Sequence, residues 1–303
     1  MKPQKPTNQQ NTQKSTPVAP QDLSARVGNL LNNKIVQGIL LLIITLVFRS
    51  NFTAIFDEKI NLGGDNIVYF SCAQAIADGK GYTNTMYFDE TPQTHFPPGY
   101  SVFIAALQPF FPNDIIAVKM ANGVLLWLSL ILLFLLVKRI TGNTIVAFCS
   151  ALFSSIQSSI LSFATIMMSE MLYIFLSLLV IHIAIYLNEK LFLKKGRWKP
   201  QLLLVVLLLL IAYVYLVRSM GISLILALIL WFGILALQSF IHFRKQKEDT
   251  ENENLRTTRT WLIQKTLVFV LVAVSFCTVN ILWGIRQSNA GIAESSYKSS
   301  FYK

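Results

Sequence analysis

Seven long runs without a charged residue constrain this chain more than any other feature of its sequence. A helix needs about 20 apolar residues to cross the hydrocarbon layer of a membrane, and each run supplies roughly enough for one crossing. Only 14% of the 303 residues are charged, which argues against a soluble domain. The sequence therefore predicts an all-α polytopic membrane protein with about seven transmembrane helices. The runs are 35–48 (extended past Arg49), 120–137, 140–169, 171–188, 200–217, 219–243 and 266–285.

The segments between these runs define the remaining organisation. Residues 1–34 are polar and rich in Pro, Gln, Asn and Thr, which predicts a disordered cytoplasmic tail. Residues 35–290 form the seven-span module, in which 50–118 is a large external loop. The apolar stretch 98–111 is short and bounded by prolines, so we expect a re-entrant or interfacial helix there. Residues 291–303 are expected to be an external tail and the start of a missing C-terminal portion.

The positions of the basic residues predict the orientation. If the N-terminus lies inside, 18 of the 26 Lys and Arg residues fall on the inner side and eight on the outer side. Bases collect on the cytoplasmic side of membrane proteins, so we expect a cytoplasmic N-terminus and an external C-terminus in a bacterial inner or plasma membrane. The net charge of +11 is then explained by the membrane topology, and the partner it implies is the lipid bilayer rather than nucleic acid.

An acidic residue stands at the start of a predicted helix in the external loop. Two glycines form a turn directly before Asp65, and apolar residues follow at helical spacing. Asp65 therefore occupies the predicted N-cap of a helix over 66–78, and capping alone would explain an isolated aspartate there. Two more glycines, at 79 and 81, are expected to close the helix.

The order of motifs in this loop resembles that of membrane glycosyltransferases that use polyprenyl-phosphate sugars, the GT-C superfamily. Its members include protein O-mannosyltransferases and lipid A aminoarabinose transferases. The loop contains Asp-x-x-x-Tyr (65–69), Gly-x-Gly-Tyr (79–82) and Pro-Pro-Gly-Tyr (97–100). Further similarities lie at the membrane boundaries. They are Ser169–Glu170, Arg218 and Trp283-x-x-Arg286, where Gln287 replaces the usual Asn, so the resemblance spans residues 35–290.

The resemblance implies transfer of a sugar from a polyprenyl-phosphate donor to a glycan, lipid or protein acceptor on the outer face, with inversion. Phosphate is a good leaving group, so one carboxylate that activates the acceptor is sufficient. The resemblance assigns that catalytic role to Asp65, with Glu170 as the second candidate. Arg218 and Arg286 would bind the donor phosphate, for which the planar Arg fork is well suited.

The remaining candidate residues concern the sugar pocket and a metal. Tyr69 and Tyr100 are candidates for the sugar pocket. His95 stands where some relatives carry an acidic metal ligand, so His95 and Glu170 are the candidates for binding a divalent metal ion. An ordinary loop histidine is an equally good interpretation of His95.

Structural roles and different functions stay open for these residues. The arginines and tyrosines also fit interfacial anchors, and Glu170 fits a carboxylate favoured by a helix N-terminus. A non-catalytic subunit that binds a lipid carrier or assists assembly would keep the fold without the chemistry. A transporter is a third possibility, although the sequence has no internal repeat to support it.

Overall fold

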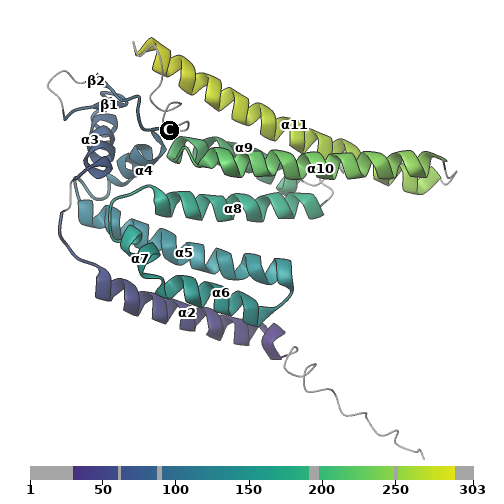
Figure 1. The fold of residues 1–303 in the computed structure, drawn as a ribbon, viewed down its shortest axis with the longest axis horizontal. Helices are drawn as coiled ribbons and strands as arrows, with labels where there is room; N and C mark the ends of the chain where they lie inside the picture. The colour runs from purple at the N-terminus through teal and green to yellow at the C-terminus, as the bar shows by residue number, and fades with distance from the viewer. Residues whose placement is uncertain (1–29, 61–62, 87–90, 191–197, 249–251, 291–303) are drawn as a thin grey trace, which may run out of the picture.

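Long helices that run back and forth between two ends build the molecule (Figure 1). The computed structural model describes residues 30–60, 63–86, 91–190, 198–248 and 252–290. Within these ranges six helices are long and apolar enough to cross a membrane, which confirms the prediction of an all-α polytopic membrane protein. They are α2 (Lys34–Ile55), α5 (Ile115–Thr141), α8 (Glu170–Glu189), α9 (Trp198–Val217), α10 (Gly221–Glu248) and α11 (Asn252–Asn289).

A bent pair of shorter helices takes the place of the predicted span at 140–169. The helices α6 (Thr144–Ile156) and α7 (Ser158–Ala164) meet at an angle of 62°. After the pair, the carbonyls of Ile166 and Met168 accept hydrogen bonds from Asn122, near the start of α5. Asn122 lies about 28 Å from the end of α5 at 1.5 Å per residue. The bent pair therefore returns the chain along most of α5 and would be the seventh crossing.

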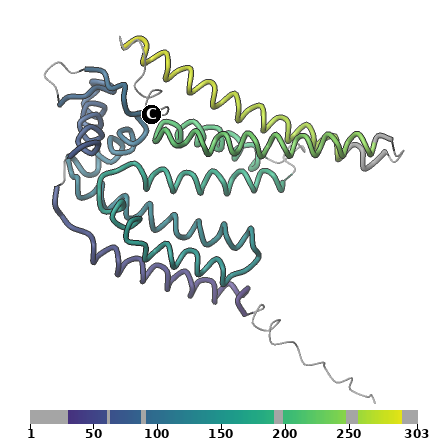
Figure 2. Tube along the Cα trace, viewed as in Figure 1, coloured from purple at the N-terminus to yellow at the C-terminus, as the bar shows by residue number. Residues whose placement is uncertain are grey.

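The helices pack side by side in a fixed order. The helix α2 packs against α6, α6 against α5, α5 against α8, and α8 against α9 (Figure 2). Both α10 and α11 pack against α9 and against each other. Phe134, Leu207 and Phe232 are completely buried between them. Large apolar side chains such as Leu230 point outward and are well exposed, as expected of helices that face lipid.

The bundle has two distinct ends. One end carries the segment between α2 and α5, together with the start of α8 and the turn between α9 and α10; we call it the loop end (Figure 1). The opposite end carries the turn between α5 and α6 and the ends of α8 and α10; we call it the far end. The connections that the sequence predicts on the outer side of the membrane thus lie together at the loop end, and those predicted on the inner side lie together at the far end.

The loop end holds two short helices and a two-stranded sheet. The helix α3 (Asp65–Ala77) packs on α4 (Gly99–Leu107), and β1 (Thr83–Asn84) pairs antiparallel with β2 (Thr91–Pro92). The nine residues of α4 extend about 14 Å, too short to cross a membrane. The prediction that this stretch is not a span therefore agrees with the structure, whereas the small sheet was not predicted.

A glycine allows α4 to approach α9 closely. A Cβ atom at Gly99 would lie 2.6 Å from the backbone C and O of Leu216 and from the backbone N of Val217. The phenol of Tyr213, also on α9, donates a hydrogen bond of 2.9 Å to the carbonyl of Gly99. This contact places the loop before α4 directly beside the end of α9.

The segment between α2 and α5 lies within the predicted external loop, 50–118. The helix α2 continues to Ile55 and α5 begins at Ile115, so both helices extend into the predicted loop past their uncharged runs. They extend because polar residues inside the ends of a helix hydrogen-bond to its own backbone. Asn51, for example, donates to the carbonyl of Val47.

The helices α10 and α11 continue through most of the charged segment at 239–260. Charged residues end an apolar span without ending a helix. Of the predicted tail at 1–34, residues 1–29 lie outside the described residues, as do 291–303, and Lys34 already belongs to α2.

A buried lysine near the start of α5 forms an ion pair and hydrogen bonds with the segment that follows α2. Lys119 is 3% exposed, and its ammonium lies 2.8 Å from Asp57 Oδ1 and 3.1 Å from the carbonyl of Lys59. The hydrogen bond from Lys119 lowers the pKa of the Asp57 carboxyl. A lowered pKa contributes stability above the unfolded pKa, and the contribution is lost as the pH falls through the folded pKa. The contribution of Asp57 to this attachment is therefore lost in acid.

Cysteine accessibility tests the orientation and the number of crossings. In a chain whose three native cysteines are replaced by Ser, we would compare Lys59→Cys at the loop end with Lys245→Cys at the far end. A membrane-impermeant maleimide added to intact cells should label only Lys59→Cys, and Lys245→Cys should react after permeabilisation. The reverse pattern would invert the orientation, and labelling of both from one side would contradict the transmembrane arrangement.

Candidate functional site

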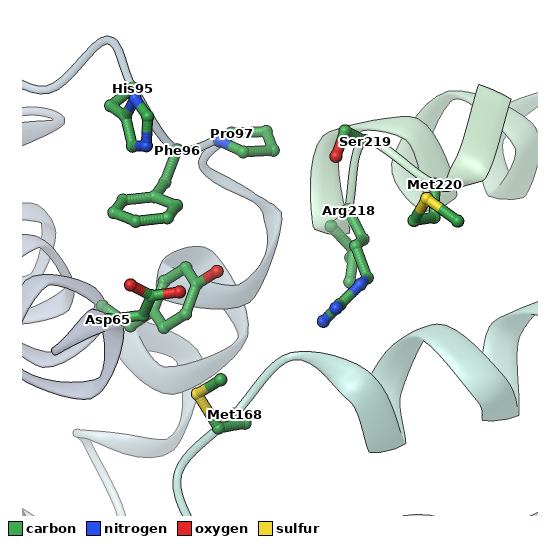
Figure 3. Close-up of a pocket in the computed structure, with 10 residues that line it drawn as sticks. Asp65, His95, Phe96, Pro97, Met168, Arg218, Ser219 and Met220 are labelled. Carbon is green, nitrogen blue, oxygen red and sulfur yellow. The ribbon is translucent and has the colours of Figure 1, made fainter. Parts of the chain in front are cut away.

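A cavity at the loop end brings four of the predicted site residues together. It has a volume of about 330 Å³ and is formed by α3, the segment before α4, the segment before α8 and the turn between α9 and α10 (Figure 3). These elements are far apart in sequence, and the Asn122 and Gly99 contacts hold them near one another. The cavity is lined by Asp65, Tyr69, His95, Phe96, Pro97, Met168, Val217, Arg218, Ser219 and Met220.

Asp65 is the first residue of α3 and lies at one side of the cavity. Its exact position differs from the prediction by one residue, because the N-cap is Gly64. Gly64 has a φ of 66°, a left-handed conformation that glycine adopts without strain. Asp65 is exposed, and a carboxylate is favoured at a helix N-terminus. Its carboxyl group can therefore meet a molecule that enters the cavity.

Arg218 lies at the other side of the cavity, across from Asp65 (Figure 3). It follows the last residue of α9, and its Nη1 atom lies 2.7 Å from Glu170 Oε1 and 3.3 Å from Ser169 Oγ. Both contacts use Nη1, whereas the guanidinium carries N–H donors on three nitrogen atoms. The donors on Nε and Nη2 therefore remain for an anion in the cavity.

Glu170 stands behind Arg218 at the start of α8. Its side chain is 16% exposed, it does not line the cavity, and it contributes the acidic partner of the ion pair. Its second oxygen, Oε2, is buried and has no hydrogen-bond partner among the described residues. The structure thus places Glu170 where it orients Arg218, in contrast to Asp65, which faces the cavity directly.

The two candidate tyrosines occupy different positions. Tyr69 lines the cavity, whereas Tyr100 is completely buried behind it, with the two rings 5.1 Å apart in a T-shaped arrangement. The Tyr100 hydroxyl accepts a hydrogen bond of 3.0 Å from Asn122 Nδ2. Burial raises the pKa of both phenols, and hydrogen bonding to Ser169 acts in the opposite direction on Tyr69. Both hydroxyls therefore stay protonated near neutral pH.

His95 lies on the cavity wall near Phe96, and the described residues around it supply few further metal ligands. Among the described residues, no three His, Cys, Asp or Glu side chains come together. The cavity lining supplies one carboxylate and one imidazole, fewer than the three protein ligands of a typical catalytic zinc site. Glu170, the other metal candidate, stands behind Arg218. We therefore derive no chemical step from a metal ion.

Arg286 lies outside the cavity and contacts the loop behind it. Its Nη1 and Nη2 atoms donate hydrogen bonds of 2.5 and 2.7 Å to the carbonyls of Gln93 and Tyr82. Its guanidinium also lies over the rings of Tyr82 and Trp283, and the neighbouring Gln287 donates to the carbonyl of Thr94. The end of α11 therefore hydrogen-bonds to the residues that flank both strands of the small sheet. The two arginines predicted to share a phosphate thus have different contacts.

Several residues that build the cavity were not predicted. Ser169 contacts Arg218 but stands out in the sequence only as part of a motif, and Asn122 was not among the candidates. Asn122 does carry a signal, because a polar side chain within an apolar run needs a partner inside the bundle. Gln93 accepts hydrogen bonds from the backbone N–H groups of Thr94 and His95 and so shapes the wall of the cavity. No sequence pattern marks it.

The fold and the cavity together define a multi-pass membrane protein with an acidic and a basic side chain on opposite sides of a cavity at one end of its helices. No family model, curated protein or solved structure matches this chain.

Exchange of backbone hydrogens tests whether Arg286 holds the loop. In Arg286→Gln we expect the amides of residues 82–86, 91, 93 and 94 to exchange at least about tenfold faster, because two hydrogen bonds from a charged donor are lost. Hydrogen–deuterium exchange with mass spectrometry on the full chain in detergent would measure the effect. Arg139→Gln, which removes a cation paired with Glu189 at the far end, is the control. Unchanged exchange in Arg286→Gln would contradict the assigned contact.

Proposed function

We propose that this chain is a membrane glycosyltransferase that moves a sugar from a polyprenyl-phosphate donor to an acceptor on the outer face of the membrane. The observation that carries the proposal is the cavity in which Asp65 and Arg218 face each other (Figure 3). The motif resemblance to the GT-C superfamily supports the same residues independently of their geometry. The sequence's bias of basic residues supports a cytoplasmic N-terminus and an external loop end.

Arg218 would bind the phosphate of the donor. The leaving phosphate gains negative charge as the bond to the sugar breaks, so a fixed cation beside it stabilises the transition state. The ion pair with Glu170 and the contact with Ser169 hold the guanidinium in place and leave donors on Nε and Nη2. Glu170 is thus a positioning residue that acts through Arg218.

Asp65 would activate the acceptor hydroxyl. The acceptor oxygen forms a bond to the anomeric carbon as the bond from that carbon to the phosphate oxygen breaks, and the hydroxyl proton passes to Asp65. The products are the glycosylated acceptor and the free polyprenyl phosphate. Because this is a single displacement, the configuration at the anomeric carbon inverts. The Tyr69 hydroxyl, which lines the same cavity, is available as a donor to the sugar.

The apolar part of the cavity suits a lipid-linked donor. Phe96, Met168, Val217 and Met220 form much of the lining, and Met220 is 52% exposed at the start of α10. A polyprenyl chain is entirely apolar and would lie along the lipid-facing side of the helices. The charged head and the apolar tail of such a donor thus match the two kinds of surface found here.

Replacement of the proposed base tests the chemistry directly. In proteoliposomes with a panel of polyprenyl-phosphate sugars and an envelope extract as acceptor source, Asp65→Asn should lower the release of polyprenyl phosphate by about 10² to 10⁴-fold. Asp78→Asn, at the exposed C-cap of the same helix, is the matched control and should keep full activity. Equal activity of Asp65→Asn and the wild type would refute the assigned base.

Replacement of Arg218 tests the phosphate contact. Arg218→Gln should lower kcat/KM by about 10² to 10³-fold, and Arg218→Lys should recover part of the loss because it restores the charge without the planar fork. Arg218→Gln leaves Glu170 without its partner, so Arg218→Gln combined with Glu170→Gln controls for folding. Normal thermal stability with lost transfer in this double variant is expected. Binding of the donor by the wild type without any transfer would instead favour a non-catalytic carrier-binding subunit.

A further inference from the structure

A second cavity lies between α10 and α11 toward the far end of the bundle. Its volume is about 330 Å³, and it is separate from the cavity that contains Asp65 and Arg218. The two helices pack along each other and bring together residues from the last part of α10 and the first part of α11. The lining residues are Gln238, Ser239, His242, Thr258, Trp261 and Lys265.

Lys265 is a buried cation with an incomplete set of partners. It is 6% exposed, and its ammonium donates to the backbone carbonyl of Asn188 at 2.6 Å and also contacts Asn188 Oδ1. It lies 4.8 Å from the ring centroid of Trp261. Among the described residues no carboxylate pairs with it. A buried charge is costly unless an opposite charge compensates it, and an ammonium has a third donor to offer.

The rest of the cavity also favours an anion. Among the described residues no carboxylate lines it, and the Gln238 amide and the His242 ring offer further N–H donors. Arg244 and Lys245 follow on α10 and are exposed, and acids follow them in the sequence at 248, 249, 251 and 253. A negatively charged group that enters the cavity would therefore meet donors, and no repulsion from the described lining.

The surroundings of the cavity favour an anion that is part of a lipid. Leu237, Ile241 and Ile263 are each about half exposed and lie next to the lining residues in sequence on α10 and α11. These apolar side chains would contact acyl chains while the headgroup occupied the cavity. Free phosphate would leave them without a partner. Basic pockets between transmembrane helices are known to hold anionic headgroups.

We propose that this cavity binds the phosphate headgroup of an anionic glycerophospholipid, with Lys265 as its main ligand. The phosphate of the lipid would be the negatively charged partner of Lys265. The lipid would also join α10 to α11 near the far end. This site does not depend on the proposed transferase activity, because it shares no residue with the loop-end cavity.

Native mass spectrometry of the full chain, with phosphatidylglycerol and phosphatidylcholine offered together, tests the proposal. The wild type should retain phosphatidylglycerol preferentially, and Lys265→Gln should lower that retention by about fivefold. Because Lys265 also contacts Asn188, Gln238→Glu is the second variant. It adds a negative charge to the cavity at an exposed position and keeps Lys265, and it should reduce retention similarly. Gln201→Glu, exposed on α9 outside the lining, is the matched control and should behave like the wild type.

The outcomes of this experiment distinguish a bound lipid from bound free phosphate. Retention that falls in both cavity variants and not in the control would support the site. Equal retention of phosphatidylglycerol in all four proteins would overturn it. A rise in thermal stability with inorganic phosphate alone, without preference for phosphatidylglycerol, would also overturn the lipid assignment and would identify free phosphate as the ligand.

Discussion

The hydrogen bonds of Asn122 are the contact on which the loop end depends. A membrane-spanning chain cannot leave backbone carbonyls unsatisfied in an apolar layer, and the break after α7 takes those of Ile166 and Met168 out of the helical hydrogen-bond pattern. Asn122, which is completely buried on α5, donates to both and also bonds to Tyr100 on α4. One side chain thereby joins α5, α4 and the segment before α8. Tyr100 packs against Tyr69, and Ser169, which follows Met168, contacts Arg218. This junction therefore helps to position both cavity residues.

The sequence predicts the positions of the membrane spans well, because charged residues are excluded from a span whichever helices pack against it. The start of α3 near Asp65 could also be predicted, since paired glycines mark a turn locally. The partner of Arg286 could not be predicted, because its acceptors are backbone carbonyls, which every residue has. The ion pair of Glu170 and Arg218 depends on how α8 packs against α9. Its members were predicted separately, and their pairing was not.

The two cavities differ in the balance of their charges. At the loop end Arg218 already has Glu170 as a partner, and Asp65 adds a second carboxylate across the cavity. Opposite charges held apart in this way can act on two parts of one molecule. At the far end the described lining residues include a cation and no carboxylate, which favours a single negative group. The same bundle therefore offers two sites of different chemistry, separated along its length.

The length of α11 links the loop to the membrane. The helix from Thr257 to Asn289 contains 33 residues and extends about 50 Å, whereas its uncharged run, 266–285, is about 30 Å long and matches the hydrocarbon layer. The remaining turns of this helix would therefore extend beyond the layer. Because Arg286 and Gln287 bond to the carbonyls of Tyr82, Gln93 and Thr94, a change in the tilt of α11 would move the segment that leads to His95 in the cavity wall. The orientation of α11 is therefore mechanically coupled to the shape of the loop end.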